Sequence, residues 1–133
     1  MKLLLDTQIL LWAMIWPELL PEKAVQLIND PGNTIYFSPA SLWEVSIKNA
    51  RNKPDFRVDA RMLRNRLLDC GYEELIINGL HTVATGDLPQ LHKDPFDRLL
   101  LAQSKVDGIK LLTCDDKIAE YPAPVLFIPK LLR

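Results

Sequence analysis

The chain has 133 residues, 48% of them hydrophobic, which is enough to fill the core of one domain. With 16 Lys and Arg against 17 Asp and Glu, its formal charge is −1, which argues against the broad basic surface of a general nucleic-acid-binding protein. Any contact with nucleic acid must therefore be local. We expect a single domain over residues 1–133.

Cysteine usage and hydropathy indicate a cytoplasmic protein. Cys70 and Cys114 lack the spacing of a metal-binding set and are expected to be reduced thiols. The apolar N-terminal stretch is interrupted by Asp6 and followed by Pro17 rather than by a small-residue cleavage site, so it does not match a signal peptide. No apolar run reaches the roughly 18 residues of a membrane span, and we expect no membrane contact.

The first third of the chain predicts strands and helices in alternation. Residues 2–5, with the apolar run Leu3 to Leu5, favour a strand buried on both faces, and Asp6 stands at its carboxyl end. Asp6 is either the N-cap of the next helix or part of a site at the strand end. The helix runs from Ile9 to Trp16 and ends at Pro17. A helix over 21–29 and a strand over 34–37 follow.

The next helix begins near Pro39 and carries Glu44. With Ser41 as the N-cap, Glu44 would close a capping box three residues later. With Ser38 as the N-cap, which Pro39 favours, Glu44 lies too deep for that role and needs another reason to be there. Lys48, four residues further on, is placed for an ion pair with Glu44 on one helix face.

The middle of the chain is less informative. Residues 51–57 predict a loop, and residues 59–69 predict a helix whose arginines form a solvated surface, with Gly71 as its stop signal. Residues 74–77 predict a strand, and residues 81–88 a short helix or turn.

A helix start is encoded by Asp94 and Pro95, because an Asp side chain caps free backbone N–H groups and the fixed φ of proline suits the first helical position. Asp97 follows in the first turn, where the helix dipole stabilises a carboxylate. By themselves, two such acids are more often capping groups than catalytic ones.

The later predicted elements are a turn at 107–108, a strand over 109–113, a short helix over 117–119 and a strand over 125–128.

Acids recur after the strands of this pattern or near the starts of the helices. Because the carboxyl ends of parallel strands meet at one edge of a sheet, we expect these acids to converge. At about 5 Å and an effective dielectric of about 20, each like-charged pair costs on the order of 3 kcal/mol, which a divalent cation offsets. The set is Asp6, Glu44, Asp97 and Asp115.

This oxygen-rich set favours Mg²⁺ or Mn²⁺, and no Cys and His quartet for zinc stands near it. A cation held by carboxylates lowers the pKa of a bound water and neutralises charge on a phosphodiester. The sequence therefore predicts metal-assisted phosphodiester hydrolysis.

Four ordered segments carry the candidate acids together with their neighbours: Leu5-Asp6-Thr7 with Ile9-Leu10-Leu11-Trp12, Ser38-Pro39-Ala40-Ser41-Leu42-Trp43-Glu44 with Ile47-Lys48, His92-Lys93-Asp94-Pro95-Phe96-Asp97-Arg98 with Ala102-Gln103, and Leu112-Thr113-Cys114-Asp115. In these segments the chain resembles PIN-domain proteins, and most closely the VapC-type toxins of bacterial toxin–antitoxin pairs. Gln8 departs from the pattern, since many of these proteins carry His there.

The resemblance implies a three-layer α/β/α sandwich with a central parallel sheet, and an endoribonuclease that depends on Mg²⁺ or Mn²⁺. It also implies a homodimer and inhibition by a small antitoxin whose C-terminal segment enters the active-site groove. Asp6 and Asp97 would be the main metal ligands, and Glu44 and Asp115 would complete the site directly or through water. Thr7 and Thr113 would give polar support or contact the substrate.

Several side chains near the site have more than one interpretation. Lys48, Lys93 and Arg98 bind RNA phosphates or form ion pairs with the acids beside them. His92 contacts the substrate, acts as a proton donor or is an exposed loop residue, and the role of Asp94 beyond capping is open. The Thr-x-Asp spacing favours Asp115 over Asp116. His81 is expected to be structural, and Trp12, Trp43 and Phe96 to pack in the core.

Other function classes fit less well. A haloacid-dehalogenase-like phosphatase needs a second Asp two residues after Asp6, where Gln8 stands. The five glycines form no phosphate-binding pattern, which disfavours nucleotide-binding folds. The remaining alternative is a PIN-like binding module without catalysis, and the presence of all four acids argues against it.

Overall fold

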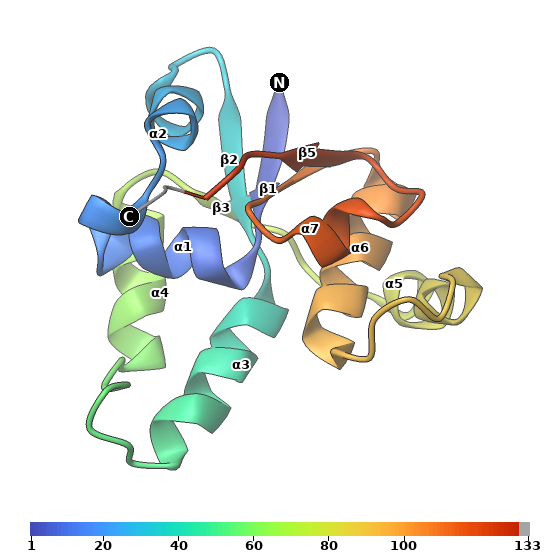
Figure 1. The fold of residues 1–133 in the computed structure, drawn as a ribbon. Coiled ribbons are helices and arrows are strands. Elements are labelled where there is room, and N and C mark those ends of the chain that lie inside the picture. Colours follow the sequence, from blue (N-terminus) through green and yellow to red (C-terminus); the bar gives the residue numbers. More distant parts are fainter. Residues whose placement is uncertain (131–133) are drawn as a thin grey trace.

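The computed structural model describes residues 1–130, and it is an α/β/α sandwich around a five-stranded parallel sheet (Figure 1). The strand order is β3-β2-β1-β4-β5, so the first strand lies in the centre. This confirms the predicted fold class. The strands are β1 (Lys2–Leu5), β2 (Thr34–Phe37), β3 (Glu73–Glu74), β4 (Lys110–Thr113) and β5 (Val125–Phe127).

Helices cover both faces of the sheet. In Figure 1, α1, α2 and α4 lie on one side of it, α6 and α7 lie on the other, and α3 descends from the end of β2. The helices are α1 (Thr7–Met14), α2 (Glu22–Asn29), α3 (Pro39–Ala50), α4 (Ala60–Asp69), α5 (Gly79–Ala84), α6 (Pro95–Asp107) and α7 (Asp116–Ala119). None of those in residues 1–130 is long and apolar enough to cross a membrane.

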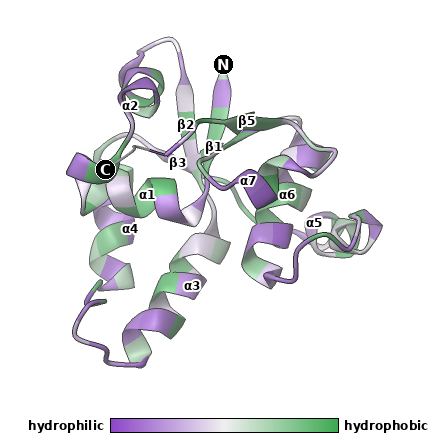
Figure 2. Cartoon of the chain, in the orientation of Figure 1, coloured by the Kyte–Doolittle hydropathy of each residue, from purple (hydrophilic) through white to green (hydrophobic). Residues whose placement is uncertain are grey.

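The core has two halves because successive side chains of a strand point to opposite faces. On β1, Leu3 and Leu5 join the cluster under α1, α2 and α4, whereas Leu4 joins the cluster under α6 and α7. All three are fully buried, as the uninterrupted apolar run predicts. Figure 2 shows hydrophobic colour on β5 and along part of β1, and alternating hydrophobic and hydrophilic colour along the helices.

The start of α3 is fixed by Ser38, which decides between the two predicted caps. The Ser38 hydroxyl oxygen accepts from the backbone N–H of Ala40 and donates to Oε1 of Gln103 on α6 at 2.6 Å. Both side chains are completely buried. Glu44 is therefore one and a half turns inside α3, and it does not close a capping box with Ser41.

Two predictions were wrong. The strand expected over 74–77 is limited to Glu73–Glu74, because the carbonyl of Leu75 accepts from the Gln103 side chain at 2.9 Å and the chain then leaves the sheet. Trp43, expected in the core, is 62% exposed.

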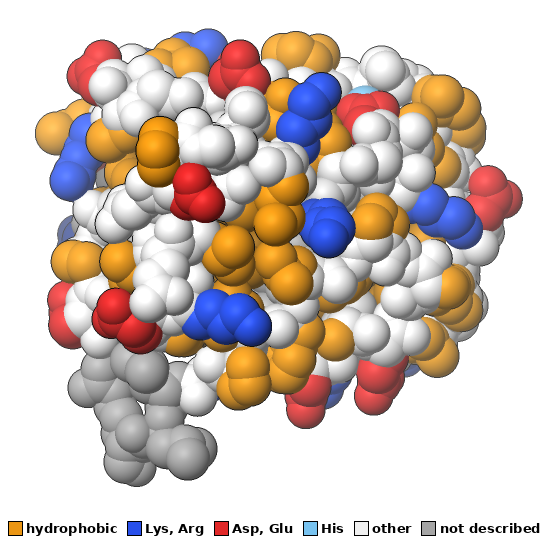
Figure 3. Space-filling model, turned by 90° about the horizontal axis from the view of Figure 1, so that it is seen from above, with side chains coloured by type: hydrophobic (Ala, Val, Ile, Leu, Met, Phe, Trp, Pro, Cys, Tyr) orange, Lys and Arg blue, Asp and Glu red, His pale blue; other side chains and the backbone are white. Residues whose placement is uncertain are grey.

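Charge is evenly distributed on the side of the molecule where β1 begins. Figure 3 shows this side from above, and acidic and basic side chains are interspersed there among apolar ones. This pattern agrees with the formal charge of −1.

Candidate active site

The direction of the strand order changes at β1, because β2 and β3 follow on one side of it and β4 and β5 on the other. In open parallel sheets such a change leaves a crevice at the carboxyl ends of the strands, where ligands bind. Asp6 directly follows β1, and its backbone N–H donates to the carbonyl of Leu112 on β4. Asp115 follows β4 by two residues. Two of the four predicted acids therefore stand at this crevice.

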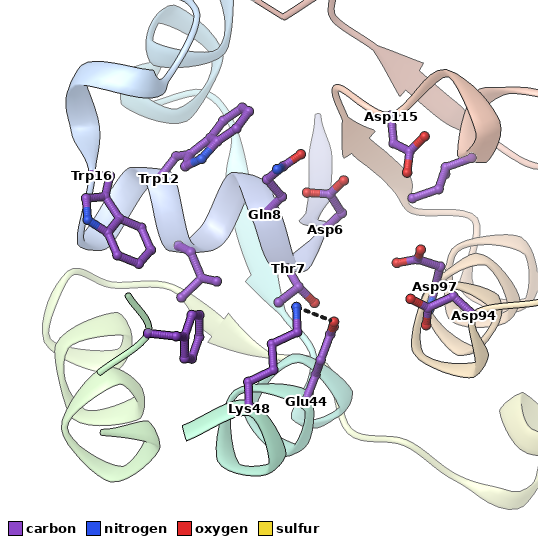
Figure 4. Close-up of a pocket in the computed structure, with 13 residues that line it drawn as sticks. Asp6, Thr7, Gln8, Trp12, Trp16, Glu44, Lys48, Asp94, Asp97 and Asp115 are labelled. Carbon is purple, nitrogen blue, oxygen red and sulfur yellow. Dashed lines mark hydrogen bonds and ion pairs between the residues drawn. The ribbon is translucent and has the colours of Figure 1, made fainter. Parts of the chain in front are cut away.

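A cavity of about 350 Å³ opens there, and all four predicted acids line it. Figure 4 shows the carboxylates of Asp6, Asp94, Asp97 and Asp115 pointing into a common space, with Glu44 below them on α3. The lining residues are Asp6, Thr7, Gln8, Leu11, Trp12, Trp16, Glu44, Lys48, Phe56, Asp94, Asp97, Asp115 and Ile118.

Asp6 is only 3% exposed and is held from two sides. Its Oδ1 accepts from the backbone N–H of Ile9, as an N-cap does, and its Oδ2 accepts from the hydroxyl of Thr113. Burial raises the pKa of Asp6 from 3.8 to about 7, although these two hydrogen bonds act in the opposite direction. The negative charges of Asp97 and Asp115 contribute to the rise.

Asp97 lies in the first turn of α6, whose N-cap is Asp94 as predicted. Its Oδ2 is 2.9 Å from Nε2 of His92. Burial raises the pKa of Asp97 to about 6; the hydrogen bond from His92 lowers it, and the charges of Asp94 and Glu44 raise it. The acids of β1, α3 and α6 are therefore close enough to affect one another's ionisation.

Glu44 supplies the clearest sign of a missing partner. Its Oε2 forms the predicted ion pair with Lys48 at 3.1 Å, but its Oε1 is buried and has no hydrogen-bond partner in residues 1–130. A buried acceptor without a donor costs free energy that a bound cation or water removes. Carboxylate oxygens are also the ligands that Mg²⁺ and Mn²⁺ prefer. The donor set therefore fits a hard divalent cation.

The tightest group of possible ligands includes two residues whose roles the sequence left open. Within the described chain, only His92, Asp94 and Asp97 bring one ligand atom each to within 4.8 Å of one another. The other predicted acids line the same cavity at wider spacing. Asp115 has a capping role as well, since its Oδ1 accepts from the backbone N–H of Lys117 at 2.9 Å.

The predicted substrate contacts divide into three groups. Thr7 and Thr113 bind other side chains, since the Thr7 hydroxyl donates to that of Ser41 at 2.9 Å and Thr113 donates to Asp6. Lys48 lines the acid cavity, and Lys93 lies beside it in a second cavity. Arg98 lines neither of these two cavities, and instead of pairing with an acid it donates to backbone carbonyls of the loop before α6.

Sequence reasoning missed the apolar wall of the cavity, which is formed by Leu11, Trp12, Trp16 and Phe56. Leu11 and Trp12 lie on α1 and Trp16 follows its end, and Trp12 and Trp16 are four residues apart, the spacing of a helical turn. That spacing was available in the sequence, but it does not distinguish a cavity wall from the core.

Comparison with known proteins adds to this geometry. The family model of the PIN domain matches residues 3–124. The chain belongs to the PIN domain family. No curated protein matches this PIN domain in sequence.

Two solved structures share its fold. VapBC2 from Rickettsia felis, crystallised with a DNA fragment from its promoter, is 18% identical, with a TM-score of 0.70 over 96% of this chain and 99% of that chain. VapBC-5 from Mycobacterium tuberculosis, of the VapBC family of toxin–antitoxin systems, is 16% identical, with a TM-score of 0.58 over 96% of this chain and 98% of that chain.

The raised pKa values predict how stability depends on pH. In the folded, metal-free PIN domain, Asp6 and Asp97 keep their protons up to about pH 7 and about pH 6, whereas in the unfolded chain they lose them near 3.8. The folded state therefore binds more protons in this window, and we expect the free energy of unfolding to decrease as pH rises through it.

Urea unfolding in EDTA at about pH 4.5 and about pH 7.5 measures this decrease. The Asp6→Asn variant should show a smaller decrease than the wild type, because its side chain does not ionise. Equal pH profiles for the two proteins would contradict the assignment.

Proposed function

We propose that this PIN domain is an endoribonuclease that depends on Mg²⁺ or Mn²⁺ and serves as the toxin of a toxin–antitoxin pair in the cytoplasm. The observation that carries the proposal is the unpaired, buried Oε1 of Glu44 in a cavity lined by four further carboxylates. Such a cavity repels anions until a cation enters it, and a cation in it attracts a phosphodiester.

Asp6 and Asp97 would be the main ligands, with Glu44 and Asp115 completing the set directly or through water. A bound divalent ion lowers the pKa of its water and neutralises charge on the non-bridging phosphate oxygens. The protein's own contribution is orientation: Thr113 holds one oxygen of Asp6, and Ile9 holds the other through its backbone N–H. The ligands are thus arranged before the substrate arrives.

A basic path for RNA leads away from the acids. The second cavity, of about 380 Å³, shares Glu44, Lys48 and Asp94 with the first. It adds Lys93 and Arg51, both of them exposed and without an ion pair in the part of the chain described. These two cations are placed to bind the phosphates next to the one that is cleaved. We do not assign Arg98 to this path, since backbone carbonyls occupy its guanidinium.

The role as a toxin draws support from the two structural neighbours, both of which are VapBC complexes or members of that family. The apolar wall of the cavity offers a docking surface for an antitoxin segment that covers the acids. Trp12 and Trp16 on this wall are only partly buried by the chain itself.

A homodimer has support from an exposed apolar surface on α3, α5 and α6. Trp43 is 62%, Leu80 60% and Val83 69% exposed. The centroids of the Trp43 and Phe96 rings lie 5.2 Å apart in an edge-to-face arrangement, a contact that favours one position of the Trp43 ring. Rigid, exposed aromatic side chains are typical of protein interfaces.

Cleavage of single-stranded RNA by the purified protein tests the activity. We expect cleavage with Mn²⁺ and none with EDTA. Asp97→Asn should reduce the rate by roughly 100-fold or more, as does the loss of a charge-stabilising group in other active sites. The same variant should unfold at an equal or higher urea concentration without metal, because the repulsion from Asp94 and Glu44 is removed.

Asp69→Asn, at an exposed position near the end of α4, is the matched control and should cleave like the wild type. Equal cleavage by the wild type and Asp97→Asn would point to contamination. RNA binding without cleavage by the wild type would favour the inactive binding module.

The basic path has its own test. Lys93→Ala should raise KM for an oligonucleotide with little change in kcat, and should reduce the slope of log KM against log salt by about 0.7, the value for one phosphate contact on a single strand. Lys105→Ala, an exposed lysine on the last turn of α6, is the control. Equal salt slopes for the two variants would exclude Lys93 from the path.

The dimer is tested by measuring mass in solution. We expect the wild type to be a dimer and Trp43→Glu to be a monomer, because the substitution places a charge in the apolar interface. Met62→Glu, at a position 63% exposed on α4, should leave the dimer intact. A monomeric wild type, or a dimer that Trp43→Glu does not disrupt, would rule out this surface.

A further inference from the structure

The loop before the acidic helix α6 is fastened by Arg98. This guanidinium lies beside the acids in sequence, yet within residues 1–130 its hydrogen bonds go to the backbone of residues 85–92 and to Tyr121, which follows α7. Its Nη1 donates to the carbonyls of Pro89 at 2.8 Å and His92 at 3.5 Å and to the hydroxyl of Tyr121 at 3.2 Å, and its Nη2 donates to the carbonyls of Thr85 at 2.8 Å and Leu88 at 3.3 Å.

The backbone of His92 receives a second anchor from Tyr121. That residue is 4% exposed, and its hydroxyl donates to the carbonyl of His92 at 3.1 Å. Two separate elements, α6 and the segment after α7, thus hold one carbonyl of a loop. Loops are more mobile than the elements they connect, so the fixing of one loop carbonyl by two elements requires a reason.

The side chain of His92 gives that reason, since its Nε2 is 2.9 Å from Oδ2 of Asp97. The two side chains are 20% and 16% exposed. With Asp97 ionised, Nε2–H donates to Oδ2, and Oδ1 keeps no hydrogen bond to any residue of the described chain. One oxygen of Asp97 is therefore fixed by the protein, and the other is left for a ligand.

We propose that His92 is a positioning residue that orients the Asp97 carboxylate for the divalent cation, and that Arg98 and Tyr121 hold His92 in place. This inference rests on the proposed metal site. Partners that orient a metal ligand without touching the metal change its affinity strongly, and their loss costs roughly 10- to 100-fold.

The chain contains a matched control. His81 also bonds an Asp through Nε2, to Oδ2 of Asp107 at 3.1 Å, and its Nδ1 accepts from the backbone N–H of Asn78. It is 1% exposed and lines neither the acid cavity nor the one beside it. Its replacement removes an equivalent contact from the fold but none from the metal site.

Calorimetric titration of the purified protein with Mn²⁺ and with Mg²⁺ tests the proposal without measuring cleavage. His92→Ala should raise Kd for both ions by roughly 10-fold or more, and His92→Gln, which keeps an N–H donor, should recover part of the loss. Tyr121→Phe removes only the hydroxyl and should raise Kd about threefold. Arg98→Lys should change Kd in the same direction, and His81→Gln should lower Tm and leave Kd unchanged.

Each outcome decides a different point. If the wild type binds ions and His92→Ala binds within about twofold of it, the positioning role is wrong and the metal site stands. A loss confined to Mn²⁺ would make His92 a direct nitrogen ligand and would also overturn the proposal. If the wild type binds neither ion, the metal site fails and the inference fails with it. Normal metal binding without RNA cleavage would refute the nuclease and leave the inference intact.

Discussion

The hydrogen bond from Thr113 to Asp6 joins the last residue of β4 to the residue after β1, and the cavity depends on it. It spans 107 residues of sequence, so it forms only when the two halves of the sheet are paired. Asp6 also caps α1 through its other oxygen. One buried carboxylate therefore links strand pairing, the start of a helix and the floor of the cavity. A purely structural cap would need neither this burial nor neighbours of the same charge.

Burial and repulsion work together in this cavity. Removing Asp6 and Asp97 from water disfavours their charged forms, and the neighbouring acids disfavour them further. The fold tolerates this free-energy cost because the packing of the surrounding sheet and helices holds the acidic side chains in these positions. Such stored cost is typical of sites where a ligand supplies what the protein lacks. The unpaired Oε1 of Glu44 is a second instance of the same imbalance.

Much of the architecture follows from local sequence patterns. Asp94 before Pro95, and Ser38 before Pro39, are capping signals that act within a single turn, so the starts of α6 and α3 are readable without tertiary information. The gathering of acids is readable because parallel strands end at one edge, whatever the details of packing. The fold class and the lining of the cavity by all four acids were therefore predictable.

Contacts between distant segments were not predictable. The end of β3 depends on Gln103, whose side-chain amide donates a hydrogen bond to the carbonyl of Leu75, 28 residues earlier in the sequence. The backbone carbonyls that accept from Arg98 lie before α6, in a segment whose sequence has no periodic pattern from which its conformation could be predicted. Trp43 has the same spacing from apolar neighbours as a core residue, and a helical pattern does not distinguish a buried apolar side chain from an exposed one.

The parallel order of the sheet also controls when a newly made chain acquires this cavity. Every strand but the last must pair with one that is synthesised far from it, and β4 and β5, which position Asp115, are the final strands along the sequence. A chain still emerging from the ribosome has Asp6 and Glu44 but lacks the strands that place Asp115 in the same cavity. The cavity lining is therefore complete only after β4 and β5 have been synthesised and paired with the rest of the sheet.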